Sequence, residues 1–126
     1  MMNTIYGEVN EGSDPYILAR VVAADGTALT HAQMTNYDLQ VYRLNSATPG
    51  TAVYSSLAQT GAILVALTTT LGWRRDTTGG NFFQQVANAN FSGKGGDSLR
   101  FLWTIRTSVW GTVLVEAIVG VRHKKG

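Results

Sequence analysis

The last third of the chain contains two long runs of alternating residues, 98–110 and 112–123, which meet at Trp110 and Gly111. In each run the residues of one parity are apolar, as expected for a β-strand with one buried face. The pattern therefore predicts a closing β-hairpin that packs against the core. The apolar positions are Leu99, Phe101, Trp103 and Ile105 in the first run and Val113, Val115, Ala117, Val119 and Val121 in the second.

The opposite face of this hairpin is only half polar, because Leu102, Leu114 and Ile118 lie among its polar positions. Two partly apolar faces offer more apolar surface than a small single domain can bury. We therefore expect these three residues, with Trp110 at the turn, to contact a neighbouring subunit. Ile118→Asp is then expected to weaken assembly more than it unfolds the domain, because burying such a side chain contributes about 1.5–3 kcal/mol.

The composition is that of one small domain with few charges. The chain has 126 residues, of which 44% are hydrophobic and 14% charged, against roughly 25% charged in average soluble domains. Low charge suits a surface that is partly covered in an assembly, and it suits equally a small β domain with a Thr, Ser, Asn and Gln surface. The chain has no cysteine, which excludes disulfides, thiolate metal sites and cysteine nucleophiles. The net charge of +2 does not by itself indicate a partner.

Targeting patterns are absent from the first residues of the sequence. The N-terminus lacks the basic and apolar segments of a signal peptide. The longest apolar stretch, 62–67, is too short to cross a bilayer. We therefore expect synthesis in a cytoplasm and no membrane partner.

Turn residues at short intervals divide the chain into short strands. Residues 1–14 are expected to form an extended N-terminal arm that is mobile until a partner binds, because they have little to bury. Deleting the arm should then leave the melting temperature nearly unchanged. Residues 15–126 are expected to form one all-β domain of seven or eight strands, with an apolar strand at 16–24 and a short helical turn within 30–35. An Ig-like β-sandwich is the first expectation for this domain and a jelly roll is the alternative.

No group of residues carries an enzymatic signature. His31 and His123 are the only histidines, and the Gly-x-Ser-x-Gly elbow of hydrolases is missing. No spacing of His, Asp and Glu indicates a metal site, and the glycine-rich turn 93–96 lacks the other residues of a phosphate loop. We expect no catalytic, metal-binding or cofactor-binding residues. Arg74 and Arg75 beside Trp73 could stack on a nucleobase, but solvated or carboxylate-paired arginines are favoured, so no specific nucleic acid partner is expected.

The stretch from Trp73 to Phe82 is expected to have a structural role. Its Asp76 would accept backbone N–H bonds within the loop, and Gly79 and Gly80 would supply positive φ angles. Phe82 would anchor the following strand in the core. Asp76→Ala is then expected to destabilise the domain, because it leaves turned backbone donors without an acceptor.

The same stretch resembles small Ig-like virion proteins of tailed bacteriophages. The shared features are a Trp, an Asp and then Gly-Asn-Phe, followed by a strand with alternating aromatic residues and a closing hairpin. The turn Asp25-Gly26 after an apolar strand fits the same family, and the likeness in pattern covers 15–123. The resemblance implies a non-enzymatic capsid decoration or cement protein, located in the virion, that bridges neighbouring capsid subunits. Its partner would be the major capsid protein or another virion protein, and it would be a homo-oligomer, with a trimer as one option.

A second function remains open for such a fold. The three tryptophans and five tyrosines could form an aromatic platform, as in a carbohydrate- or surface-binding β-sandwich module on a phage particle. Sedimentation separates the two hypotheses, because a cement protein should associate with itself or with shells, whereas a lectin should bind glycans.

Overall fold

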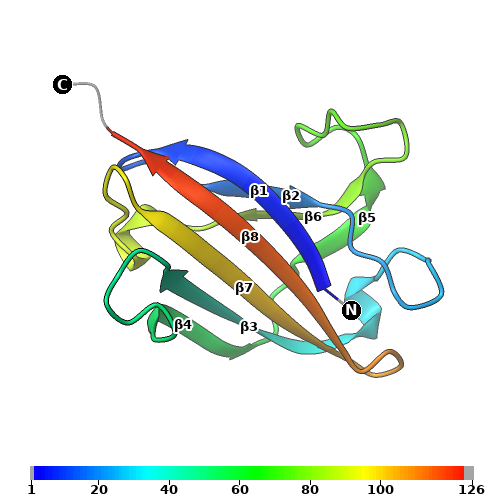
Figure 1. The fold of residues 1–126 in the computed structure, drawn as a ribbon. Coiled ribbons are helices and arrows are strands. Elements are labelled where there is room, and N and C mark those ends of the chain that lie inside the picture. The colour runs from blue at the N-terminus through cyan, green and yellow to red at the C-terminus, as the bar shows by residue number, and fades with distance from the viewer. Residues whose placement is uncertain (1, 124–126) are drawn as a thin grey trace.

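The alternating runs form the strands of two stacked β-sheets in the computed structural model, which describes residues 2–123 (Figure 1). The expected all-β sandwich is confirmed, and its described part has no α-helix. Two short 3₁₀ turns interrupt the strands, η1 (His31–Gln33) and η2 (Asn88–Asn90), and η1 is the helical turn expected within 30–35. The strands are β1 (Met2–Asn10), β2 (Tyr16–Ala19), β3 (Met34–Arg43), β4 (Ala52–Gln59), β5 (Leu64–Thr68), β6 (Gly80–Gln85), β7 (Ser98–Thr107) and β8 (Thr112–Arg122).

The two sheets differ in width. The larger sheet has five strands in the order β1-β8-β7-β3-β4, and the smaller sheet has three in the order β2-β6-β5. The predicted closing hairpin is present as β7 and β8, which pair antiparallel from Ser98 opposite Gly120 to Arg106 opposite Thr112. Its alternation places Leu99, Phe101, Trp103 and Ile105 in the core, as predicted. The Trp103 ring meets Phe82 of the smaller sheet edge-on, with centroids 5.0 Å apart.

The expected N-terminal arm is not separate from the sandwich. The segment is extended, but Met2–Asn10 pairs in parallel with β8 and forms the edge strand β1. Ile5 and Val9 pack against the core, and the Glu11 N–H donates to the Arg122 carbonyl at 2.9 Å. The sequence did not reveal this pairing, because the inward positions include Gly7 between Ile5 and Val9, which leaves only two apolar residues on that face.

The apolar strand expected at 16–24 is shorter than its sequence suggests. The ladder with β6 ends at Ala19, because the backbone N–H and C=O groups of Val21 form hydrogen bonds with the Asn81 side chain instead of with a strand. An isolated bridge, Val22 to Ala28, closes the turn that follows. Hydrogen bonds of a side chain thus replace those of a strand at this point.

The margins of the larger sheet are less buried than its centre. At one margin Ile5 and Val9 of β1 face inward yet remain half-buried. At the other margin the inward Tyr37 and Tyr54 are likewise half-buried. A depression forms at each margin, and both are candidate sites.

Candidate functional site

The structure brings three of the four expected interface residues together. Leu102, Leu114 and Ile118 lie on the outer face of the larger sheet, where Leu102 pairs with Glu116 and is therefore a diagonal neighbour of the other two. All three side chains are half-buried. Trp110 lies apart from them, in the turn between β7 and β8, where it packs against the edge of the core. The structure has no partner chain, so their contact with a neighbouring subunit stays a prediction.

Ion pairs cover much of this outer face. Arg106 binds Asp38 at 2.6 Å, and Arg100 pairs with Glu116 while its guanidinium lies 5.5 Å from the ring centre of Tyr42. The hydrogen bonds from Arg106 and from the Ala58 N–H hold the pKa of Asp38 below its usual value. The outer face of the larger sheet therefore combines these three apolar residues with charges that are already paired.

The loop before β6 is built around Asp76, as the sequence predicts. The Asp76 carboxylate accepts the N–H groups of Thr78 and Gly79, both at 3.1 Å, and the Trp73 Nε1–H at 3.0 Å. It also forms an ion pair with Arg20. The Arg20 hydrogen bond, with those from Gly79 and Trp73, lowers the pKa of Asp76 to about 2. Asp76 therefore stays ionised at any physiological pH.

The two glycines of this loop act in different ways. Gly79 has a φ of +95°, as predicted, and a Cβ there would lie 2.5 Å from the Thr68 carbonyl oxygen. Gly80 has no positive φ, so that expectation is corrected: this position needs glycine because a Cβ would lie 2.6 Å from the Trp73 ring. Phe82 is fully buried and anchors β6 as predicted.

Trp73 lies between two arginines. The guanidinium of Arg20 is 5.5 Å and that of Arg75 is 5.1 Å from the indole centre. Arg20 is the residue that pairs with Asp76, whereas Arg75 is exposed and forms no ion pair with a described residue. Arg75 is therefore an exposed cation within this loop that has no carboxylate partner among the described residues.

Sequence reasoning missed Asn81, the buried polar centre of the smaller sheet. Its Oδ1 accepts the Val21 N–H at 2.7 Å, and its Nδ2 donates to the carbonyls of Val21 and Leu29 at 2.9 and 2.8 Å. The side chain is fully buried. The only signal in the sequence is a polar residue inside the otherwise apolar start of β6, which does not reveal its partners.

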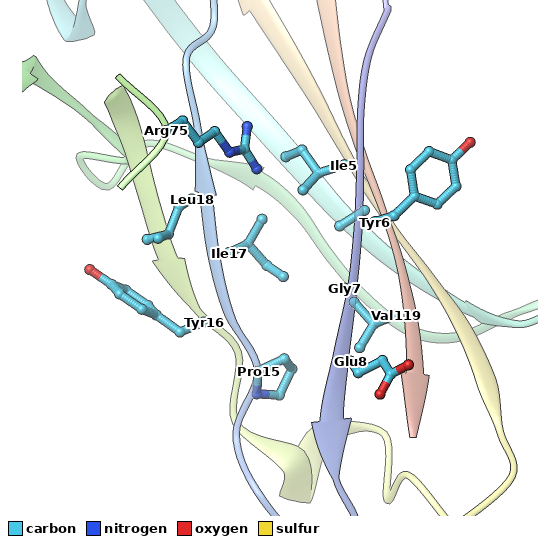
Figure 2. A pocket seen from close by; sticks show the side chains of 11 residues that line it. Ile5, Tyr6, Gly7, Glu8, Pro15, Tyr16, Ile17, Leu18, Arg75 and Val119 are labelled. Carbon is cyan, nitrogen blue, oxygen red and sulfur yellow. The ribbon is translucent and has the colours of Figure 1, made fainter. Parts of the chain in front are cut away.

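The depression beside β1 is an apolar groove between the edge strands β1 and β2 (Figure 2). It has a volume of about 170 Å³, and its inner surface includes Ile5, Ile17 and Val119. Gly7 lies between Ile5 and Val9 on β1, and a Cβ there would meet no atom within 4 Å. Figure 2 shows the guanidinium of Arg75 at one end of the groove, pointing toward Ile5. We call this site the apolar groove.

The depression at the opposite margin has a different chemistry. It has a volume of about 280 Å³ and lies between β3, β4 and the end of β6, with Trp103 on its buried side. None of its lining residues is charged. Burial, together with the neighbouring Tyr54, raises the pKa of the Tyr37 hydroxyl. We call this site the polar cleft, and its polar lining residues are Tyr37, Tyr54, Ser56, Gln84, Gln85 and Asn90.

The outer face of the smaller sheet is uncharged. Strands β2, β5 and β6 contain no Asp, Glu, Lys or Arg. Val65 and Leu67 on β5 are 44% and 42% exposed, and they lie where β5 loses its regular register with β6. Tyr16 and Leu71 are also exposed, and the Tyr16 hydroxyl donates to the Leu71 carbonyl at 3.4 Å. We call this surface the small-sheet face, and its residues are Tyr16, Leu18, Val65, Leu67, Leu71 and Phe83.

Residues 2–123 contain neither a metal-binding cluster nor a membrane-spanning helix. Within that range no group of three or more His, Asp or Glu side chains is close enough to hold a metal ion. No helix there is long and apolar enough to cross a bilayer. His31 lies in η1, and His123 follows β8, so the two histidines belong to different elements.

Comparisons with known proteins give no relative. No protein-family model matches the chain, and neither a curated protein nor a solved structure matches it.

Proposed function

We propose that this chain is a non-enzymatic structural protein of a virion, which decorates or cements the capsid by bridging neighbouring subunits. The observation that carries the proposal is the small-sheet face. Soluble monomers seldom leave several large apolar side chains together on a surface, and Tyr16, Val65, Leu67 and Leu71 are each more than two-fifths exposed. The three strands of this face carry no charged residue, and the nearby Arg20 is paired with Asp76. Such a face suits contact with another protein.

The strand order supports an Ig-like assignment within this proposal. The order β8-β7-β3-β4 with β2-β6-β5 opposite corresponds to strands G, F, C and C′ facing B, E and D of variable-type Ig domains. The parallel strand β1 then occupies the position beside strand G. This order agrees with the resemblance to small Ig-like phage proteins.

The state of the carboxylates favours a non-enzymatic role. Asp38, Asp76 and Asp97 each accept hydrogen bonds from an arginine and from a backbone N–H, and each has a lowered pKa. Arginine and backbone donors, with the Trp73 N–H at Asp76, lower the pKa of Asp38 and Asp76. At Asp97 burial acts to raise the pKa, but the Lys94 N–H, the Asn45 side chain and Arg43 together lower it. A general acid needs the opposite shift. These carboxylates are therefore suited to holding loops in place.

Cementing requires only modest contacts at each copy. A protein repeated around a shell engages many sites at once, so weak individual contacts combine into strong retention. A homo-oligomer, such as a trimer at a symmetry axis, would multiply the effect further. The small-sheet face and the outer face of the β7–β8 hairpin give each copy two surfaces for such contacts.

The test is to look for the chain in purified particles of the virus that encodes it. We expect mass analysis to find it at a fixed copy number per shell, and particles lacking it to lose their contents at a lower temperature. Purified chain added back should restore the heat resistance.

Two matched variants locate the surface that binds the shell. Leu67→Asp, on the small-sheet face, should lose rebinding, whereas Leu57→Asp, at a 56% exposed residue of β4, should not. Particles that never contain the chain, or whose heat resistance does not depend on it, would contradict the proposal.

The polar cleft supports a second candidate, a carbohydrate-binding module. Aromatic rings beside amides and hydroxyls are the groups that contact the apolar faces and hydroxyls of sugars, and the cleft combines two tyrosines with Gln84, Gln85 and Asn90. A glycan array, followed by Tyr54→Ala, tests this candidate. Saturable binding that Tyr54→Ala abolishes would favour it over the structural role.

A further inference from the structure

The smaller sheet is one strand short at the apolar groove. Strand β2 is its edge and has β6 as its neighbour. The Val86 N–H donates to the Pro15 carbonyl at 3.0 Å, so the alternate residues Ile17 and Ala19 also direct their backbone groups toward β6. The backbone N–H and C=O groups of Tyr16 and Leu18 therefore point to the free side of β2.

A strand added beside β2 would cover the apolar groove. It would extend the smaller sheet over β1 and place every second side chain toward Ile5 and Val119. A strand added to the outer edge of β1 would instead extend the larger sheet past the groove and leave it open. The remaining edges are less regular, because β4 carries register shifts and a positive φ at Ala58, and β5 loses its register with β6.

The groove has room for one side chain, because the central residue of β1 on this side, Gly7, has no side chain of its own. Gly7 has the inward parity of Ile5 and Val9, and a Cβ at this position would meet no atom within 4 Å. The groove as a whole has a volume of about 170 Å³, similar to an apolar cavity of about 150 Å³ that holds a benzene-sized group. One leucine or phenylalanine side chain of an incoming strand would fill it.

Two charged residues line the groove, Arg75 and Glu8, and Glu8 is already paired with Arg122. The Arg75 guanidinium points toward Ile5 at one end of the groove (Figure 2), and it has no carboxylate partner among the described residues. Strands β1 and β2 offer no second cation on the groove. A carboxylate on the occupant would therefore meet Arg75.

We propose that the apolar groove binds an extended peptide segment of a partner protein, which pairs with the free edge of β2, inserts one apolar side chain above Gly7 and places a carboxylate against Arg75. This is β-strand addition, in which backbone hydrogen bonds give affinity and alternate side chains give specificity. The inference deepens the proposed function and rests on it for the existence of a partner.

The first test needs only the protein. In amide hydrogen exchange we expect Ile17, bonded to β6, to exchange slowly and Tyr16 and Leu18, on the free side of β2, to exchange rapidly. Equal protection of the three amides would overturn the proposal, because the edge would already be paired.

The second test uses two synthetic probes with blocked ends, Asp-Thr-Leu-Thr-Val-Thr for antiparallel addition and its reverse sequence for parallel addition. We expect one of them to shift the NMR signals of the Tyr16 and Leu18 amides in a saturable manner at about 1 mM. No saturable shift, or shifts confined to another edge strand, would overturn the proposal.

Three variants make the test specific. Gly7→Val should abolish peptide binding and raise the melting temperature, because the new side chain fills the groove from within. Arg75→Glu should weaken binding about fivefold, whereas Arg74→Glu, the same charge change one residue away, should not. Unchanged binding in Gly7→Val would overturn the proposal, as would self-association of the chain through β2, which would make a second copy the occupant.

The two proposals can fail separately. Particles that retain the chain while the probes do not bind would overturn this inference alone. Probes that bind while purified particles never contain the chain would overturn the virion role alone.

Discussion

Single side chains replace strand hydrogen bonds in the smaller sheet, and Asn81 is the main example. Its three hydrogen bonds hold the backbone of Val21 and Leu29 where β2 has already ended. A buried amide stabilises the fold only when all its hydrogen bonds are made, because each buried donor or acceptor without a partner lowers the stability by about 1–3 kcal/mol. The turn that follows β2 therefore depends on this residue.

Asn81→Leu is expected to lower the free energy of unfolding by about 2 kcal/mol or more, because the buried Val21 N–H and Leu29 carbonyl lose their partner. Urea unfolding measures the change. Asn90→Leu is the control, since Asn90 is exposed, and it should change the stability by no more than a few tenths of a kcal/mol. Equal effects in the two variants would contradict this role of Asn81.

Asp76 is expected to make stability depend on pH in the acid range. Its pKa is about 2 in the folded protein against an ordinary 3.8, so folding favours the ionised form. Its contribution is complete above about pH 4 and is lost as the pH falls toward 2. Urea unfolding from pH 6 to pH 2 should show that the wild type loses more stability than Asp76→Asn, which lacks this group. Parallel curves would show that the ion pair with Arg20 does not stabilise the fold.

The sequence identified Asp76 but not its cation. An Asp three residues before a glycine is a local pattern, and the bonds to Thr78 and Gly79 follow from it. Arg20 lies 56 residues earlier in the chain, so no local pattern connects the two. The partners of Asn81 could not be predicted for the same reason, because Val21 and Leu29 are 60 and 52 residues away in the sequence.

At the scale of elements, β1 is an integral strand of the larger sheet, and only one of its two faces packs against the core. Its inward residues Ile5 and Val9 are half-buried, whereas its outward residues Thr4 and Tyr6 are exposed. The register with β8 is continuous from Met2 to Asn10. Such a strand should stabilise the domain even without a partner.

Deleting residues 1–10 is therefore expected to lower the stability by about 2 kcal/mol or more, since two half-buried apolar side chains and a strand ladder are lost. Thermal unfolding measures the loss. Replacing Ile5 and Val9 together by Ser should reproduce most of it, and the matched outward pair Thr4→Ser and Tyr6→Ser should not. An unchanged melting temperature after deletion would restore the interpretation of residues 1–14 as a mobile arm.

Strand pairs that are close in the sequence could be predicted, whereas pairs that are distant in the sequence could not. The hairpin of β7 and β8 was predicted because both strands show strict alternation and are joined by a short turn. The pairing of β1 with β8 was not, because Thr4 and its partner Glu116 are 112 residues apart. The early end of β2 was missed because a tertiary contact, not a local breaker, ends the strand.

At the scale of the molecule, a β-sandwich could be predicted from the sequence, but the unequal width of its two sheets could not. The number of strands follows from alternation and turns, whereas the assignment of each strand to a sheet depends on contacts distant in sequence. Both marginal depressions arise from that assignment. The apolar groove and the polar cleft therefore could not be predicted from local sequence patterns.

The parallel arrangement of the first and last strands has a mechanical consequence. The start of β1 and the end of β8 lie at opposite ends of the sandwich (Figure 1), so tension applied to the two termini would load the ladder between them in shear. All nine residue pairs would then resist the force together. In a single-molecule experiment, pulling at the two termini should require a higher force than pulling at residue 2 and Gly111, which would peel the strands apart pair by pair. A chain held at both termini would therefore resist mechanical unfolding through the β1–β8 ladder.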